Sequence, residues 1–118
     1  MQRDLLATRI AAQQARAATR AQGLRQKLPA GAALLRAHGA TRVVLFGSLA
    51  RDGAAHGASD VDLAVWGLDG STYFRVLAEL AELLGTDVDL VEMEKASASL
   101  RERVARDGIE LVGGDEPR

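Results

Sequence analysis

The spacing of hydrophobic and polar positions changes several times along this chain, and each change marks the boundary of a predicted element. Residues 2–28 have no proline and one glycine, Gly23, among Ala, Arg, Gln and Leu residues. This composition predicts one long helix, with Gly23 as the position where it could break. Pro29 and Gly31 predict its end, and residues 32–38 predict a separate short helix. The apolar positions of the long helix form a narrow stripe that would bury little surface: Leu6, Ile10, Ala17, Ala21, Leu24 and Leu28.

Strand and helix patterns alternate in the rest of the chain. The apolar run 41–46 predicts a buried strand, the alternation of acids and aliphatics in 60–66 predicts a second strand, and residues 87–92 predict a third. Helices are predicted over residues 72–84 and 99–106. This alternation predicts an α/β or α+β fold, with a small sheet flanked by helices. In the helix over 72–84, one face would point toward the core, and its residues would be Phe74, Leu77, Ala81 and Leu84.

Length and composition are those of one ordinary folded domain. The chain has 118 residues, of which 47% are hydrophobic and 26% charged. It has no cysteine, which excludes disulfides, thiolate metal sites and a thiol nucleophile, and its two histidines, His38 and His56, are too few for a histidine-rich metal site. No apolar run approaches the roughly 20 residues that span a bilayer, so we expect a cytoplasmic protein without a membrane partner. Any chemistry has to use carboxylates, hydroxyls and arginines.

The charges divide the chain into two unlike parts. Residues 1–42 hold eight bases and one acid, a net charge of 8 − 1 = +7, whereas residues 43–118 hold seven bases and fifteen acids, 7 − 15 = −8. The basic helix is therefore interpreted as a docking surface for a partner, including a second copy of the chain, with a merely solvated face as the alternative. No aromatic residue lies among its arginines, so nucleic acid is not the expected ligand. We expect a basic helix at 1–28, a domain at 29–112 and a flexible tail at 113–118.

Three aspartates carry the candidate chemistry. Asp60 and Asp62 are two residues apart on a predicted strand, so both side chains would project from one face of the sheet. Asp87 and Asp89 repeat this spacing on the next predicted strand, which could bring a third carboxylate to the same cluster. Clustered carboxylates repel one another unless a cation binds them, and two divalent ions held in this way suit phosphoryl transfer. For an Asp-x-Asp pair alone, two solvent-exposed acids are the simpler interpretation.

A Gly-Ser corner makes that simpler interpretation less favoured. Gly47 and Ser48 follow the first strand, where a residue without Cβ permits close approach and Ser48 offers a hydroxyl and an amide as donors to phosphate. Arg51 follows within the next turn, and Ser59 directly precedes Asp60. The order of strand, Gly-Ser, Ala-Arg, loop and Ser-Asp-x-Asp is far more specific than any of its parts.

In these segments the sequence resembles the minimal nucleotidyltransferases of the DNA polymerase beta superfamily. The matching segments are Val-Val-Leu-Phe-Gly-Ser-Leu-Ala-Arg at 43–51, Ser-Asp-Val-Asp-Leu-Ala-Val at 59–65, Val-Asp-Leu-Val at 88–91 and a trailing helix with Leu-Arg-Glu-Arg at 100–103. The resemblance implies a mixed sheet flanked by helices that binds a nucleoside triphosphate with two Mg2+ ions. It further implies that Gly47 and Ser48 hold the β and γ phosphates, with Arg51 and Ser59 completing the nucleotide site. Asp60 and Asp62 would then ligate both ions, and Asp89 would ligate the catalytic one. Asp87 matches no position of the family motif and is interpreted as an acid that faces solvent or lies behind the metal ligands.

The resemblance also implies a reaction and a partner. Members of this family that stand alone resemble antitoxins that transfer AMP from ATP to a hydroxyl of a HEPN-type toxin, so a protein adenylyltransferase is expected. One departure from the family pattern is Asp52, which stands between Ala-Arg and Gly53 and places an additional carboxylate near the expected triphosphate. An antitoxin or adaptor that acts by binding alone, with a vestigial or regulatory nucleotide site, is therefore the alternative.

Overall fold

A computed structural model of the chain describes residues 2–52 and 61–113. Its helices are α1 (Gln2–Ala37), α2 (Gly47–Asp52), α3 (Tyr73–Leu84) and α4 (Ala98–Asp107). Its strands are β1 (Arg42–Phe46), β2 (Val61–Trp66), β3 (Val88–Glu92) and β4 (Ile109–Val112). Two short 3-10 turns, η1 (Gly70–Thr72) and η2 (Met93–Lys95), precede α3 and follow β3. The predicted combination of a small sheet and flanking helices is confirmed.

The four strands form one mixed sheet in the order β3-β2-β1-β4. β1 is antiparallel to both β2 and β4, and β2 is parallel to β3. A parallel pair needs a crossover connection, and α3 supplies it. The short apolar segment 109–112, which carries no clear strand signal in the sequence, completes the edge of the sheet beside β1.

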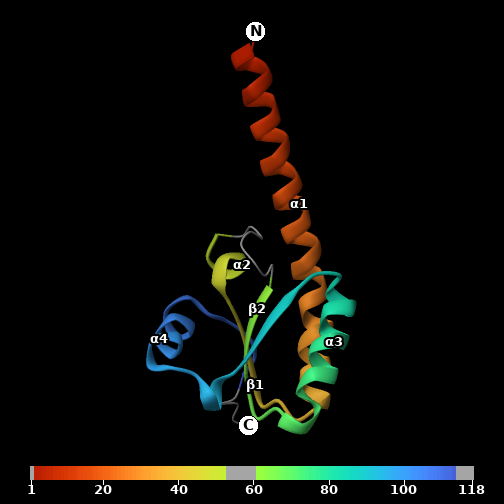
Figure 1. The fold of residues 1–118 in the computed structure, drawn as a ribbon, viewed down its shortest axis with the longest axis vertical. Coiled ribbons are helices and arrows are strands. Elements are labelled where there is room, and N and C mark those ends of the chain that lie inside the picture. Colours follow the sequence, from red (N-terminus) through yellow and green to blue (C-terminus); the bar gives the residue numbers. More distant parts are fainter. Residues whose placement is uncertain (1, 53–60, 114–118) are drawn as a thin grey trace.

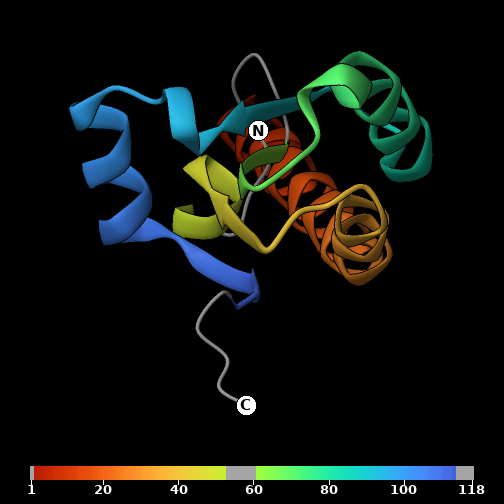
Figure 2. The ribbon, with the colours of Figure 1, turned by 90° about the horizontal axis from the view of Figure 1, so that it is seen from below.

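The two faces of the sheet have separate hydrophobic cores. α1 and α3 cover one face, where their apolar side chains pack on alternate strand residues such as Val43, Leu45 and Leu63. α4 covers the other face, where Val104 packs against Val44. Figure 2 shows the sheet between these two layers. Because strand side chains alternate between faces, a residue next to Leu63 in the sequence must point toward α4.

The helix α1 is continuous, so the separate short helix predicted over 32–38 is wrong, and the expected boundary at residue 28 lies inside α1. Pro29 removes one backbone hydrogen bond and disfavours a helix interior by about 3 kcal/mol. That penalty is exceeded by the packing of the residues on both sides of it, since Leu28 and Leu35 are buried in the core. Gly31 also lies against Leu80 of α3, which brings the two helices close together.

The N-terminal half of α1 extends beyond the domain. Figure 1 shows it continuing past the end of α3, which gives the molecule dimensions of 58 × 28 × 27 Å. We call residues 5–20 the arm. The predicted apolar stripe is consequently divided: Leu24 and Leu28 are buried, whereas Leu6 and Ile10 on the arm are exposed. Within the described residues, no helix is long and apolar enough to cross a membrane.

The inward face of α3 differs from the predicted one. Val76, Leu80 and Leu84 are its buried residues, and Phe74 is 81% exposed. The turn η1 sets the start of the helix, because the Asp69 side chain accepts hydrogen bonds from the amide and hydroxyl of Ser71. Val76, Leu80 and Leu84 are four residues apart, so the apolar spacing also allows this face, and packing against α1 and the sheet selects it.

Two glycines make a matched test of this packing. A Cβ on Gly108, between α4 and β4, would overlap the carbonyl of Val104 and the side chain of Val44, whereas a Cβ on Gly23 would meet nothing within 4 Å. We predict that Gly108→Ala lowers the free energy of unfolding by about 1–3 kcal/mol through overpacking. Gly23→Ala should raise it by about 0.5–1 kcal/mol, because alanine favours the helix. Urea unfolding followed by circular dichroism measures both, and equal stability of the two variants would contradict the packing described.

Candidate functional site

The candidate site lies where β1 ends and β2 and β3 begin. Asp62 on β2 is paired with Phe46 on β1 and, on its other side, with Asp89 on β3. Residues paired in this way point to the same face of a sheet, so the two carboxylates are neighbours on the face that α4 covers. The prediction that these two aspartates share one face is confirmed.

Gly47 makes the corner at which β1 turns into α2. Its φ of +76° lies in the left-handed region, which disfavours residues with a Cβ. A Cβ at this position would also overlap the carboxylate of Asp62. Two independent constraints therefore require glycine here, and one of them is the close approach of the backbone to Asp62.

The electrostatics of Asp62 are those of a carboxylate among like charges. Partial burial raises the pKa of the Asp62 carboxyl above its usual 3.8, and the charge of Asp89 raises it further. Arg103, which extends from α4, lowers this pKa in part. The sheet thus holds together two carboxylates that a cation would stabilise.

The other predicted residues of the corner lie on α2. Ser48 is buried, with 8% of its surface exposed, and Arg51 is exposed in the last turn of the helix. Arg25 of α1 donates a hydrogen bond of 3.2 Å to the carbonyl of Leu49, whose side chain is fully buried. The short helix that carries Ser48 is therefore fixed to the core and to the long helix.

Two predicted site residues, Ser59 and Asp60, lie outside the described residues. Asp87 is exposed, in agreement with its interpretation as a solvent-facing acid. In the segments 2–52 and 61–113, no group of three His, Cys, Asp or Glu side chains is placed to hold a metal ion. The third carboxylate of the expected cluster thus stays a prediction.

The structure brings two further side chains to the site. Arg103 lies in a segment that resembles the family, but the sequence alone gives it no role; its proximity to Asp62 depends on how α4 crosses the sheet. Tyr73 donates a hydrogen bond to the carbonyl of Leu90, next to Asp89. Burial raises the pKa of the Tyr73 phenol, and the charges of Asp89 and Glu92 raise it further. The spacing of charges and aromatics along the chain reveals neither contact.

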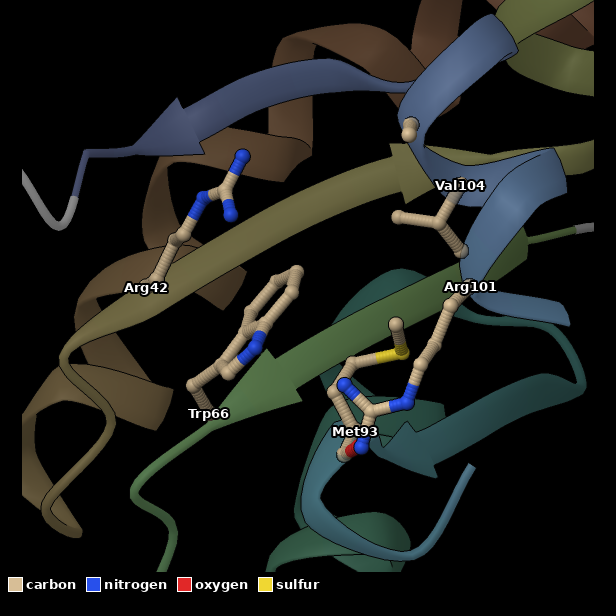
Figure 3. A pocket seen from close by; sticks show the side chains of 6 residues that line it. Arg42, Trp66, Met93, Arg101 and Val104 are labelled. Atoms are coloured by element: carbon tan, nitrogen blue, oxygen red, sulfur yellow. The ribbon is translucent and has the colours of Figure 1, made fainter. Parts of the chain in front are cut away.

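A hollow of about 260 Å³ lies on the same face at the opposite end of β2 (Figure 3). Arg42 and Arg101 line it, but both already have partners. Arg42 forms a two-point ion pair with Glu110 and stacks on Trp66 at 4.4 Å, and Arg101 donates to the carbonyl of Met93. These contacts hold α4 and the edge strand β4 against the rest of the domain. The packing of these elements therefore accounts for the hollow.

The Gly47 corner and the aspartate pair both lie in the part of the chain that is similar to known proteins. The family model "Polymerase beta, Nucleotidyltransferase" matches residues 33–117, which is most of the chain. The chain belongs to this nucleotidyltransferase family. The match begins within α1, so the arm lies outside the part that characterises the family.

Individual nucleotidyltransferases are similar to this chain. The protein adenylyltransferase MntA of Shewanella oneidensis is 38% identical over 74 residues, which are 60% of this chain and 52% of that protein. The chain thus matches about half the length of this curated relative. A crystal structure of a toxin-antitoxin with AMP-PNP is 34% identical, with a TM-score of 0.63, and the match covers 76% of this chain and 73% of that one. A structure of tri-AMPylated Shewanella oneidensis HEPN toxin in complex with MNT antitoxin gives 28% identity and a TM-score of 0.60, over 76% and 72% of the two chains.

The like-charge pair makes a prediction for stability. Because folding raises the pKa of Asp62, the wild type gains stability as the pH falls from neutral through that raised pKa toward 3.8. The variant Asp62→Asn has no charge to bury, so we predict that its thermal midpoint at neutral pH in EDTA is higher than that of the wild type, by up to about 5 °C. The difference should shrink as the pH falls. A lower midpoint of the variant at neutral pH would mean that the Asp62 carboxylate is net stabilising without metal.

Proposed function

We propose that this chain transfers AMP from ATP to a hydroxyl group on a partner protein and releases pyrophosphate. The observation that carries the proposal is the pairing of Asp62 with Asp89 directly beside the Gly47 corner. Neither carboxylate contributes to the hydrophobic core, and burial opposes the charge of Asp62. An arrangement that does not stabilise the fold is typical of a functional site. The similarity to a protein adenylyltransferase supports AMP as the transferred group.

A divalent cation fits this pair. Two carboxylates that repel each other on one face of a sheet are hard oxygen ligands, which Mg2+ prefers. We infer that Asp62, Asp89 and Asp60 hold two Mg2+ ions, with Asp60 assigned by the sequence alone. Such ions supply charge stabilisation for a transferring phosphoryl group.

The remaining residues would bind and orient the nucleotide. The backbone at Gly47 has no side chain to keep a phosphate away, and Ser48 offers its amide and hydroxyl next to it. Arg51 and Ser59 complete the proposed nucleotide site. Arg103, near Asp62 on α4, adds a positive charge on the side from which a triphosphate would approach.

The partner that we infer is a HEPN-type toxin. The similar structures that contain an MNT antitoxin or a toxin-antitoxin pair support this choice, as does the AMP-modified toxin in one of them. Because ATP is the AMP donor, we place the reaction in the cytoplasm.

The decisive experiment measures transfer of labelled AMP from ATP to a purified HEPN-type toxin. We predict that Asp62→Asn and Asp89→Asn each lower the rate at least about a thousandfold, because each removes charge stabilisation worth several kcal/mol. Asp60→Asn should have the same effect. The matched control is Asp87→Asn, which removes the same charge from an exposed residue and should stay within about twofold of the wild type.

Two results would count against the proposal. Transfer that survives Asp62→Asn would place the chemistry elsewhere. Neutralisation of the toxin by the wild type without any transfer of AMP would instead favour an antitoxin that acts by binding alone.

A further inference from the structure

Most of the exposed large hydrophobic side chains gather on two separate surfaces. Among the described residues, the arm carries three of them and α3 carries two. Isolated exposed apolar residues are ordinary, but a cluster of them on a helix is typical of an interface. The residues concerned are Leu5, Leu6 and Ile10 on the arm and Phe74 and Leu83 on α3, with Ile109 on β4 outside both groups.

The first of these surfaces, on the arm, is basic. Residues 2–20 contain four arginines and one aspartate, a net charge of 4 − 1 = +3. At about 100° per residue, Leu6 and Ile10 lie on one face of the helix, and Arg9 and Arg16 lie together along one flank of that face. All four side chains are exposed. The arm thus presents a short apolar stripe beside a row of positive charge.

The second surface, on α3, is acidic. Its charged residues are Glu79, Glu82 and Arg75, a net charge of 1 − 2 = −1. The exposed side of α3 carries Glu79 and Glu82 between Phe74 and Leu83. The Phe74 ring lies edge-on against Tyr73, with 5.1 Å between ring centroids, and is 81% exposed. Aromatic side chains are enriched at protein interfaces, where they bury a large apolar area.

These two surfaces are opposite in charge, but they cannot meet within one chain. The arm, 16 residues or about 24 Å as a helix, is long enough to lie along the whole of α3, which has 12 residues or about 18 Å. The arm belongs to one continuous helix that points away from its own α3, as Figure 1 shows, so it cannot fold back. We propose that the arm of one copy packs on α3 of a second copy, and that the second arm does the same in return, which closes a two-fold symmetric dimer.

Sedimentation of the full chain tests the apolar half of this interface. We expect a dimer of twice the 12.5 kDa chain mass, with a dissociation constant of about 10 µM or tighter. Leu6→Gln with Ile10→Gln should weaken it at least about tenfold, and so should Phe74→Ala. The control with the same polarity change is Ala11→Gln with Ala15→Gln, which alters the opposite side of the arm and should stay within about twofold. Point variants are used instead of deletion of the helix, because Ala21, Leu24 and Leu28 of the same helix are core residues.

A charge exchange between two variants tests the pairing itself. A chain with Arg9→Glu and Arg16→Glu has an acidic arm, and a chain with Glu79→Arg and Glu82→Arg has a more basic α3. Each variant alone would pair like charges, so each should sediment as a monomer. In an equimolar mixture, both arm contacts join opposite charges, and we expect the dimer to return. Raising the salt from about 0.05 M to about 0.5 M should weaken the wild-type dimer.

Each result of these sedimentation experiments supports or overturns a definite part of the proposal. A wild type that stays monomeric at about 100 µM overturns the proposal, and so does a dimer that none of these variants weakens, because it would use another surface. A mixture that stays monomeric overturns the pairing of the arm with α3. Circular dichroism of every variant distinguishes loss of the dimer from loss of the fold. None of these results depends on nucleotidyl transfer, so the dimer and the proposed function can fail independently.

Discussion

The repulsion between two carboxylates governs the functional end of this molecule. Asp62 and Asp89 are opposite each other on parallel strands, so the register of the sheet, and not the flexibility of a side chain, keeps them together. Burial and the charge of Asp89 both raise the pKa of Asp62, which means that the folded chain bears an unfavourable interaction here. A fold retains such an interaction when a ligand compensates for it.

The rest of the structure is organised around keeping this pair in place. α1 and α3 cover one face of the sheet and leave the face with the aspartates to the smaller helix α4. Arg25 ties α2 to α1, which fixes the Gly47 corner beside Asp62. Arg103 provides the nearby positive charge that partly offsets the repulsion. Packing on one face thus supports chemistry on the other, as in many small α/β proteins.

Much of this site could be predicted from the sequence because it depends on short-range rules. The two-residue period of a strand places Asp62 opposite to Val61 and Leu63, and a Gly-Ser pair after an apolar run indicates a tight corner. The contacts of Arg103 and Tyr73 depend instead on how α4 and α3 cross the sheet, which no local pattern encodes. Asp60 and Ser59 stay predictions that rest on the motif alone.

The differences in the fold have the same physical origin. Pro29 is an ordinary helix breaker, but burial of the leucines on either side of it outweighs that local preference. Phe74 fits an apolar helical period, yet the packing of Val76, Leu80 and Leu84 in the core leaves it at the surface. In both cases tertiary packing determined the observed structure, because local helix propensity and apolar spacing did not determine it. It also produced the exposed arm, which the charge distribution predicts as a docking surface without revealing what it binds.

Binding of Mn2+, as a paramagnetic substitute for Mg2+, tests the central claim most directly. Electron paramagnetic resonance of the full chain with Mn2+ alone reports the free ion, and hence its dissociation constant, without any nucleotide or acceptor protein. The account predicts that Asp62→Asn and Asp89→Asn each weaken Mn2+ binding at least about tenfold, a loss of about 1.4 kcal/mol or more, whereas Asp87→Asn leaves it unchanged. Equal Mn2+ affinity in all four proteins would show that this aspartate pair does not form the metal site.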